Sequence, residues 1–206
     1  MTKKRWFVYL SVFEDLYDLV ISDLLSKEVS KPVGLLYSKG QQKRVNPENY
    51  KDLLFFSDIF EKSKNYEPDV DYLSYLEDKY SISSLSLIIF SDRHIGYDHK
   101  ISYRQKLALL ELTFKFANEL IEKYKFEFAW FESISGLLSY VLYTVFKFEG
   151  VKICAIESGR FPDKLAVTDN KNLLWDGVEQ EIDIVEKDGA KSWEVEEAKE
   201  FLEQYR

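Results

Sequence analysis

Residues 126–156, FEFAWFESISGLLSYVLYTVFKFEGVKICAI, decide the fold class of this chain. The β-prone apolar run at Phe126–Phe131 predicts a strand. Apolar residues then recur at helical spacing from Gly136 to Phe148, and a second apolar run predicts a strand over Val151–Ile156. Strand, helix and strand in this order indicate a β-α-β unit, whose parallel strands are nearly always joined by a right-handed crossover.

The N-terminal part of the chain repeats this order. A continuous apolar run at Trp6–Val12 is typical of a strand that is buried on both faces of a parallel sheet. Helical spacing of apolar residues follows over Glu14–Glu28, and Val33–Ser38 predicts the second strand. Two such units predict an α/β, Rossmann-like three-layer domain with a mostly parallel sheet and helices on both faces.

The remaining segments complete this expectation. A third strand is predicted within Leu53–Phe56, and the strongest helical pattern lies over Ile101–Lys125. Further expected segments are a polar loop at 39–44, a helix at 69–80, a loop after Arg160 and an acidic helix at about 193–205.

At 206 residues, the chain is long enough to bury a sizeable core, and no repeat or flexible linker divides it. We expect one Rossmann-like domain over residues 1–190. Residues 191–206 are expected to form a helix that leads into a further C-terminal domain, since the sequence stops at this helix without a closing cap.

The composition restricts the possible partners and the compartment. A net charge of -8 argues against a general nucleic-acid surface, which needs a concentrated basic patch. The single cysteine, Cys154, excludes an internal disulfide, and we expect it to be a buried and slowly reacting core residue. No signal peptide or membrane-spanning run is visible, so we expect a cytoplasmic protein without direct membrane insertion; association with the inner face of the membrane stays open.

Ligands of open parallel sheets bind beyond the carboxyl ends of the strands, so the polar residues there are the first candidates. These clusters are Ser11–Asp15, Glu132–Gly136 and Glu157–Arg160. Ser133 and Ser135 lie where a helix begins, and they either expose backbone N–H groups to an anion or simply cap the helix. No phosphate-loop or dinucleotide-binding glycine motif occurs.

Two charged groups complete the candidates. Glu157 and Arg160 are either a carboxylate and a guanidinium aimed into a cleft or a structural ion pair, and Ser158 lies between them. The run Asp92-Arg93-His94 offers a candidate general base in His94, which is otherwise a surface or capping histidine. His94 and His99 have no zinc-site spacing, so no metal is expected.

The stretch from Glu132 to Arg160 resembles the N-terminal domain of two-domain sugar enzymes of the glycosyltransferase B architecture, especially those of surface and capsular polysaccharide biosynthesis. The resemblance rests on Phe131-Glu132-Ser133, on Glu149-Gly150-Val151 and on Ile156-Glu157-Ser158-Gly159-Arg160. The last segment is also similar to a motif of UDP-N-acetylglucosamine 2-epimerases, but it lacks that motif's histidine and one residue before the arginine.

The resemblance implies an acceptor-side domain of a glycosyltransferase, with a carbohydrate acceptor and a sugar nucleotide donor that binds to the C-terminal domain. In that case this domain binds no cofactor of its own. Glu157 and Glu132 are then the catalytic candidates, and the substrate-binding candidates are Arg160, Ser133, Ser158, Asp92, Arg93 and His94. The alternatives are a non-catalytic binding or assembly domain in polysaccharide export, and an epimerase-like enzyme.

Overall fold

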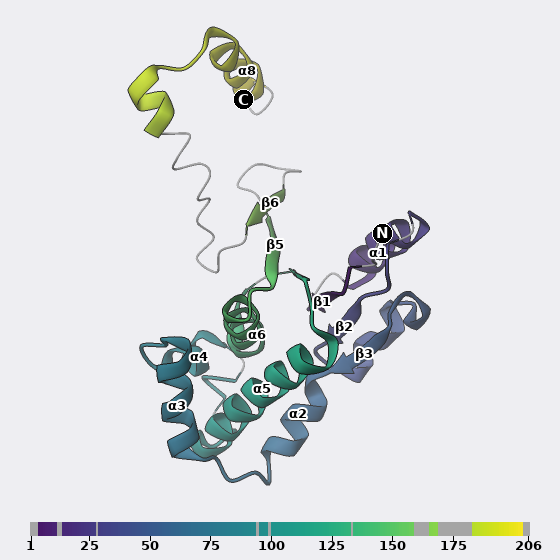
Figure 1. Cartoon of the computed structure of the whole chain (residues 1–206), viewed down its shortest axis with the longest axis vertical. Coiled ribbons are helices and arrows are strands. Elements are labelled where there is room, and N and C mark those ends of the chain that lie inside the picture. The colour runs from purple at the N-terminus through teal and green to yellow at the C-terminus, as the bar shows by residue number, and fades with distance from the viewer. Residues whose placement is uncertain are drawn as a thin grey trace. The chain divides into compact units, whose positions relative to one another are not determined.

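The structure is a computed structural model that describes residues 4–11, 14–27, 29–93, 95–98, 100–132, 134–158, 165–168 and 183–203. The chain divides into two compact units, Met1–Lys171 and Asn172–Arg206, which are considered separately. The first unit contains the sheet and the helices that pack on it (Figure 1).

A six-stranded sheet forms the centre of the first unit, in the order β3-β2-β1-β4-β5-β6. Strands β1 to β5 are parallel, and β6 is antiparallel to β5. The α/β, Rossmann-like expectation is therefore confirmed. The bounds are β1 Trp6–Leu10, β2 Val33–Leu36, β3 Asp52–Phe55, β4 Phe128–Phe131, β5 Lys152–Ser158 and β6 Leu165–Thr168.

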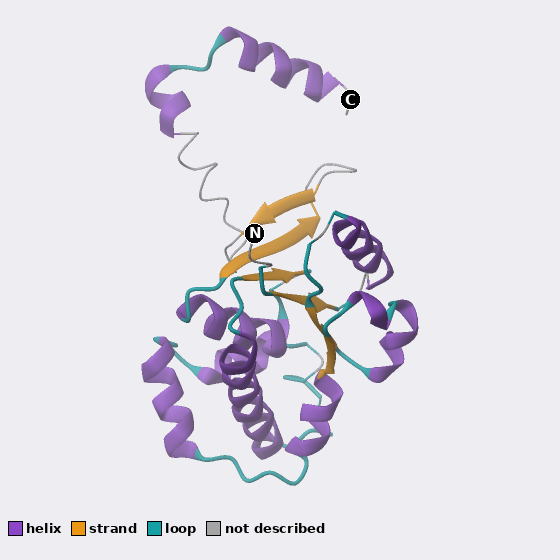
Figure 2. Cartoon of the chain, turned by 45° about the vertical axis from the view of Figure 1, so that its right-hand side comes forward, coloured by secondary structure: helices purple, strands orange, loops and turns teal. Residues whose placement is uncertain are grey.

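Helices cover both faces of this sheet, as Figure 2 shows. One face is packed by α1 and by two short 3-10 helices, η1 and η2, and the other by the remaining helices of the unit. The bounds are α1 Glu14–Ser26, η1 Lys39–Arg44, η2 Pro47–Asn49, α2 Phe56–Ser63, α3 Val70–Tyr80, α4 Leu85–Ser91, α5 Tyr103–Tyr124 and α6 Gly136–Phe148.

Strand β1 explains how the two layers are held together, because all five of its side chains are buried. Successive side chains of a strand point to opposite faces. Trp6, Val8 and Leu10 therefore contact the α1 side, whereas Phe7 and Tyr9 contact the other layer. The continuous apolar run of the first strand is thus matched by a core on each face.

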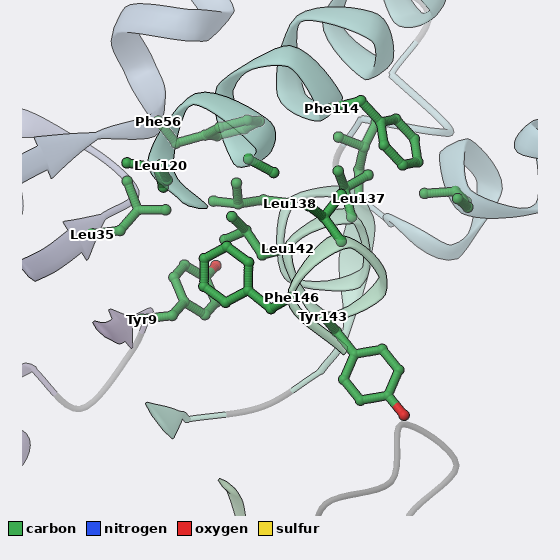
Figure 3. Close-up of a cluster of buried hydrophobic side chains, with 14 of the residues drawn as sticks. Tyr9, Leu35, Phe56, Phe114, Leu120, Leu137, Leu138, Leu142, Tyr143 and Phe146 are labelled. Atoms are coloured by element: carbon green, nitrogen blue, oxygen red, sulfur yellow. The ribbon is translucent and has the colours of Figure 1, made fainter. Parts of the chain in front are cut away.

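The larger core lies between the sheet and helices α5 and α6. Figure 3 shows Tyr9 of β1 beside Leu142 and Phe146 of α6, and Leu35 of β2 nearer to Leu120 of α5. Phe146 is fully buried and its ring lies 5.1 Å from the ring of Phe7, edge to face. Such aromatic pairs add to the stability that burial of their area supplies.

Three segments differ from the sequence-based expectation or add to it. Residues 85–91, whose apolar run had no assigned element, form α4, which begins at the cap residue Ser84. The expected loop at 39–44 contains a 3-10 helix, and the expected loop after Arg160 contains β6. Strand β6 is only four residues long and pairs only with β5, so its sequence signal is weak.

Cys154 is half-buried, so the expectation of a buried thiol is wrong. It lies in β5 and packs beside Trp130 and Phe128, on the face of the sheet that carries α1. Phe128 of β4 is likewise only partly covered on this face. Partial burial still raises the pKa of the Cys154 thiol.

In the second unit, residues 183–188 form a short helix and Ser192–Glu203 forms α8. The acidic helix expected at the C-terminal end is confirmed, while none of the described residues of this unit is buried. The expected domain boundary at residue 190 concerns a further domain and stays a prediction. Among the described residues, every helix is too short or too polar to cross a lipid bilayer.

Candidate functional site

A cavity of about 1180 Å³ opens beyond the carboxyl ends of β1 and β2 and at the start of α6. The sheet order places β1 between β2 and β4, so the chain changes direction across the sheet at this point. Parallel sheets bind ligands at such a switch point. Among the described residues, the lining is Tyr9, Ser11, Glu14, Tyr37, Ser38, Gly40, Gln41, Arg44, Ser91, Asp92, Arg93, Ser135 and Gly136.

Asp92 connects the loop after α4 to the start of α6. Its carboxylate accepts hydrogen bonds from the backbone N–H of Ile95 at 2.9 Å and of Leu137 at 3.1 Å. Ser135 is the N-cap residue of α6, yet its side chain makes no cap hydrogen bond. Asp92 therefore occupies the helix end that the sequence offered to a bound anion, and its negative charge is stabilised by the helix dipole.

Gly136 makes this close approach possible. Its φ is 81°, and a Cβ atom on it would lie 2.8 Å from Oδ2 of Asp92. A side chain at this position would meet both the strained backbone and the carboxylate. The glycine is thus needed for the contact between α6 and the loop after α4.

Ser11 and Glu132 join the ends of β1 and β4. Glu132 is 6% exposed, and its Oε2 accepts from the backbone N–H of Ser11 at 2.7 Å and from the Ser11 hydroxyl at 3.1 Å. Ser11 lines the cavity and Glu132 lies behind it. Glu132 therefore fixes the direction in which the Ser11 oxygen presents its lone pairs to a ligand.

Gln41 closes the wall of the cavity on the β2 side. Its side chain accepts from Ser38 N at 2.8 Å and donates to Ser11 O at 2.8 Å and to the carboxylate of Glu14. Glu14 also accepts from Nη1 of Arg44 at 3.3 Å. The segments after β1 and β2 are therefore tied together by one partly buried polar network around the buried carboxylate of Glu14.

Two tyrosines supply the aromatic part of the lining. The Tyr9 ring is buried, and burial together with nearby Tyr37, Glu132 and Asp92 raises the pKa of its hydroxyl. Tyr37 is 37% exposed and its pKa is raised by burial and by Asp92. Both hydroxyls are therefore neutral donors at physiological pH.

The structure brings Asp92, Arg93 and Glu132 to this one edge of the sheet. Glu157 and Ser158 lie in β5, where Ala155 is paired with Phe131 of β4, so their backbone is at the same edge. Ser133, His94 and Arg160 lie outside the described residues. The rule about strand ends also predicts that Arg160 lies near Glu132 at this edge, and this stays a prediction.

Sequence reasoning assigned no site role to Tyr37, Gln41 or Arg44. The sequence could have indicated these residues, because they follow β2 as Ser11 follows β1. Ligands bind beyond the carboxyl ends of parallel strands, and this applies to both β1 and β2. The sequence analysis places Tyr37 in the second strand and assigns Gln41 and Arg44 only to a polar loop. Glu14 lay within a candidate cluster, but its partnership with Gln41 and Arg44 depends on how the chain folds between β1 and β2.

Comparison of the chain with protein-family models and with curated proteins finds no match. Within the part of the chain that the structure describes, no group of three or more histidine, cysteine, aspartate or glutamate side chains is placed to hold a metal ion.

Proposed function

We propose that the chain is the acceptor-binding domain of a glycosyltransferase in surface polysaccharide biosynthesis, and that the acceptor binds in the cavity at the edge of β1, β2 and β4. One observation carries the proposal. The cavity is lined by hydroxyl, amide and tyrosine groups together with two carboxylates and two arginines, and the carboxylates of Glu14 and Asp92 are already hydrogen-bonded within the wall. Such a lining suits a ligand rich in hydroxyl groups, and the helix N-terminus at Leu137 that would otherwise hold a nucleotide phosphate is occupied by Asp92.

The polar groups of the lining can both donate hydrogen bonds to sugar hydroxyls and accept hydrogen bonds from them. Ser11 donates to Glu132 and keeps lone pairs for an incoming O–H, whereas Tyr37 can donate and also stack on a sugar ring. In this proposal the acceptor hydroxyl gives its proton to the oxygen of Ser11 when transfer occurs, and Ser11 gives its own proton to Glu132, which acts as the base. Glu157 is the alternative base, because its backbone lies at the same edge.

The donor sugar nucleotide would bind to a C-terminal domain outside this sequence, in a cytoplasmic protein. The chain by itself should therefore bind acceptor saccharides without consuming a sugar nucleotide. Release of nucleoside diphosphate from a panel of sugar nucleotides measures the second part, and saturable release by the 206-residue chain would contradict it.

Binding is tested by saturation-transfer NMR with neutral and acidic saccharides. We expect Tyr37→Ala to weaken saccharide binding about tenfold, because it removes the exposed ring and hydroxyl of the lining. Tyr75→Ala is the matched control, since Tyr75 is an exposed tyrosine of α3 that does not line the cavity. Equal binding by both variants, or no binding of any saccharide, would overturn the proposal.

A further inference from the structure

Arg44 ends η1 and lines the cavity, with its side chain 60% exposed. A guanidinium group has several N–H donors in a planar fork. Among the described residues, only Nη1 is used, in the contact with Oε2 of Glu14 at 3.3 Å. Most of the donor groups of Arg44 are therefore left for a ligand.

Arg44 is held by a buried anchor, which distinguishes it from an ordinary surface arginine. The side chain of Glu14 is 1% exposed, and it also binds Gln41. Gln41 is in turn fixed to Ser11 and Ser38. The arginine is consequently pre-positioned at the wall of the cavity, which lowers the entropic cost of binding an anion.

The charges that remain accessible in the cavity are positive. Glu14 is directed into its contacts with Gln41 and Arg44, and Asp92 is directed to the backbone N–H groups of Ile95 and Leu137. Arg93 also lines the cavity, is exposed, and forms no ion pair with any described residue. The described lining thus holds two cations and two carboxylates, and the carboxylates are the groups whose oxygens are already engaged.

We propose that the ligand of this cavity carries an anionic group, the carboxylate or phosphate of an acidic saccharide, and that Arg44 binds this group with Arg93 as the second cation. A fork of N–H donors matches both anions in a bidentate manner. The saccharide part rests on the proposed function, whereas the requirement for an anion rests on the arginines alone.

The test compares three probes of similar size: glucose, glucuronate and glucose 6-phosphate. We expect the wild-type chain to bind at least one of the two anionic probes about tenfold more tightly than glucose, since a charge-assisted contact is roughly twice as strong as a neutral one. Which of the two binds more tightly distinguishes a carboxylate from a phosphate ligand. The preference should decrease between about 0.05 M and about 0.3 M salt because the site is open to solvent.

Arg44→Gln should abolish most of this preference, whereas Arg44→Lys should keep part of it, because lysine retains the charge without the planar fork. Arg104→Gln is the matched control, since Arg104 is an exposed arginine that is paired with Glu67 and does not line the cavity. If Arg44→Gln does not fold, Arg93→Gln takes its place, because Arg93 is exposed and supports no buried group.

Equal affinity for glucose and both anionic probes would overturn the inference, as would an undiminished preference in folded Arg44→Gln or Arg93→Gln. If no saccharide binds at all, the proposed function fails, and inorganic phosphate then decides the anion site separately. Phosphate binding that is lost in the Arg44 variant supports the inference, and phosphate binding that ignores Arg44, or is absent, contradicts it.

Discussion

Gly136 and Gly150 are two glycines with nearly the same backbone conformation, with φ values of 81° and 77°, in different surroundings. A Cβ atom on Gly150 would meet nothing within 4 Å, whereas one on Gly136 would meet the carboxylate of Asp92 at 2.8 Å. Asp92 cannot move without losing its two backbone hydrogen bonds. The pair therefore separates the cost of the backbone conformation from the cost of displacing Asp92.

We expect Gly150→Ala to lower the free energy of unfolding by about 1 kcal/mol, which is the cost of the backbone conformation alone. Gly136→Ala should lower it by about 2–4 kcal/mol, because the hydrogen bonds of Asp92 are also strained or lost. Urea unfolding of both variants measures the difference. Equal losses would show that Asp92 moves freely.

Tyr9 makes the stability of the fold depend on alkaline pH. Burial raises the pKa of its hydroxyl far above the ordinary value of 10.0, so the folded state keeps the proton while the unfolded state loses it. Stability is therefore fully present below pH about 10 and decreases as the pH rises above it, by up to about 1.4 kcal/mol for each pH unit.

Urea unfolding at several pH values between about 8 and about 11 should show this decrease, and Tyr9→Phe should make it less steep. Tyr50 is also buried and has a raised pKa, so part of the dependence should remain. Tyr75→Phe removes an exposed hydroxyl and should leave the slope unchanged. An identical slope in wild type and Tyr9→Phe would contradict the assignment.

At the scale of elements, a buried carboxylate attaches the segment between α2 and α3 to α5. Glu111 has a fully buried side chain and accepts from the Tyr66 hydroxyl at 2.6 Å, from Asp69 N at 2.7 Å and from Lys115 Nζ at 2.6 Å. Lys115, whose side chain is 40% exposed, also donates to the Tyr66 hydroxyl. The connection is therefore fixed by polar contacts rather than by apolar packing alone.

Glu111→Ala should destabilise the protein by about 2–4 kcal/mol, because it leaves the N–H of Asp69 and the Tyr66 hydroxyl without their acceptor. Lys115→Ala should cost about 1–3 kcal/mol, because Glu111 keeps its other two donors but its buried charge loses the lysine, whose side chain is itself partly exposed. The measurement is the urea midpoint of each variant. A larger loss for Lys115→Ala would mean that the lysine, and not the carboxylate, holds the connection.

The elements that the sequence predicts well are those whose environment is uniform along their length. Trp6–Leu10 is buried on both faces, so its sequence is continuously apolar and does not alternate between apolar and polar residues. The helix Gly136–Phe148 has the bounds that the sequence predicts. Residues 85–91 are too short for their apolar run to indicate a helix or a strand. Their helical state is set by the cap at Ser84 and by packing against α6.

The sequence predicts only those residues of the candidate site that follow the carboxyl end of a predicted strand or an apolar run. The rule about strand ends selected Ser11, Glu14 and Glu132 in their clusters, and the charged run after the apolar segment selected Asp92 and Arg93. The contacts that build the cavity join residues far apart in the sequence, such as Asp92 with Leu137 and Ser11 with Glu132. Local patterns contain no information on such pairs, because they depend on the order of the strands in the sheet.

At the scale of the molecule, the core is confined to the first unit. Every buried residue among the described ones precedes residue 156, and the described residues of the second unit bury no side chain. Stability in a domain comes mainly from buried apolar surface. The unit that ends at Lys171 should therefore fold without the residues that follow it.

We expect a chain of residues 1–171 to unfold cooperatively, with a urea midpoint and a melting temperature close to those of the full chain. The control is a chain that ends at residue 150, which removes β5 and uncovers β4 and α6, and which should not fold. Calorimetry and circular dichroism of the three chains measure both expectations. A large loss of stability in the 1–171 chain would mean that residues 172–206 contribute to the fold. Retention of the cavity's saccharide binding by the 1–171 chain would further place the proposed acceptor site within the first unit alone, because all of its described lining residues precede residue 137.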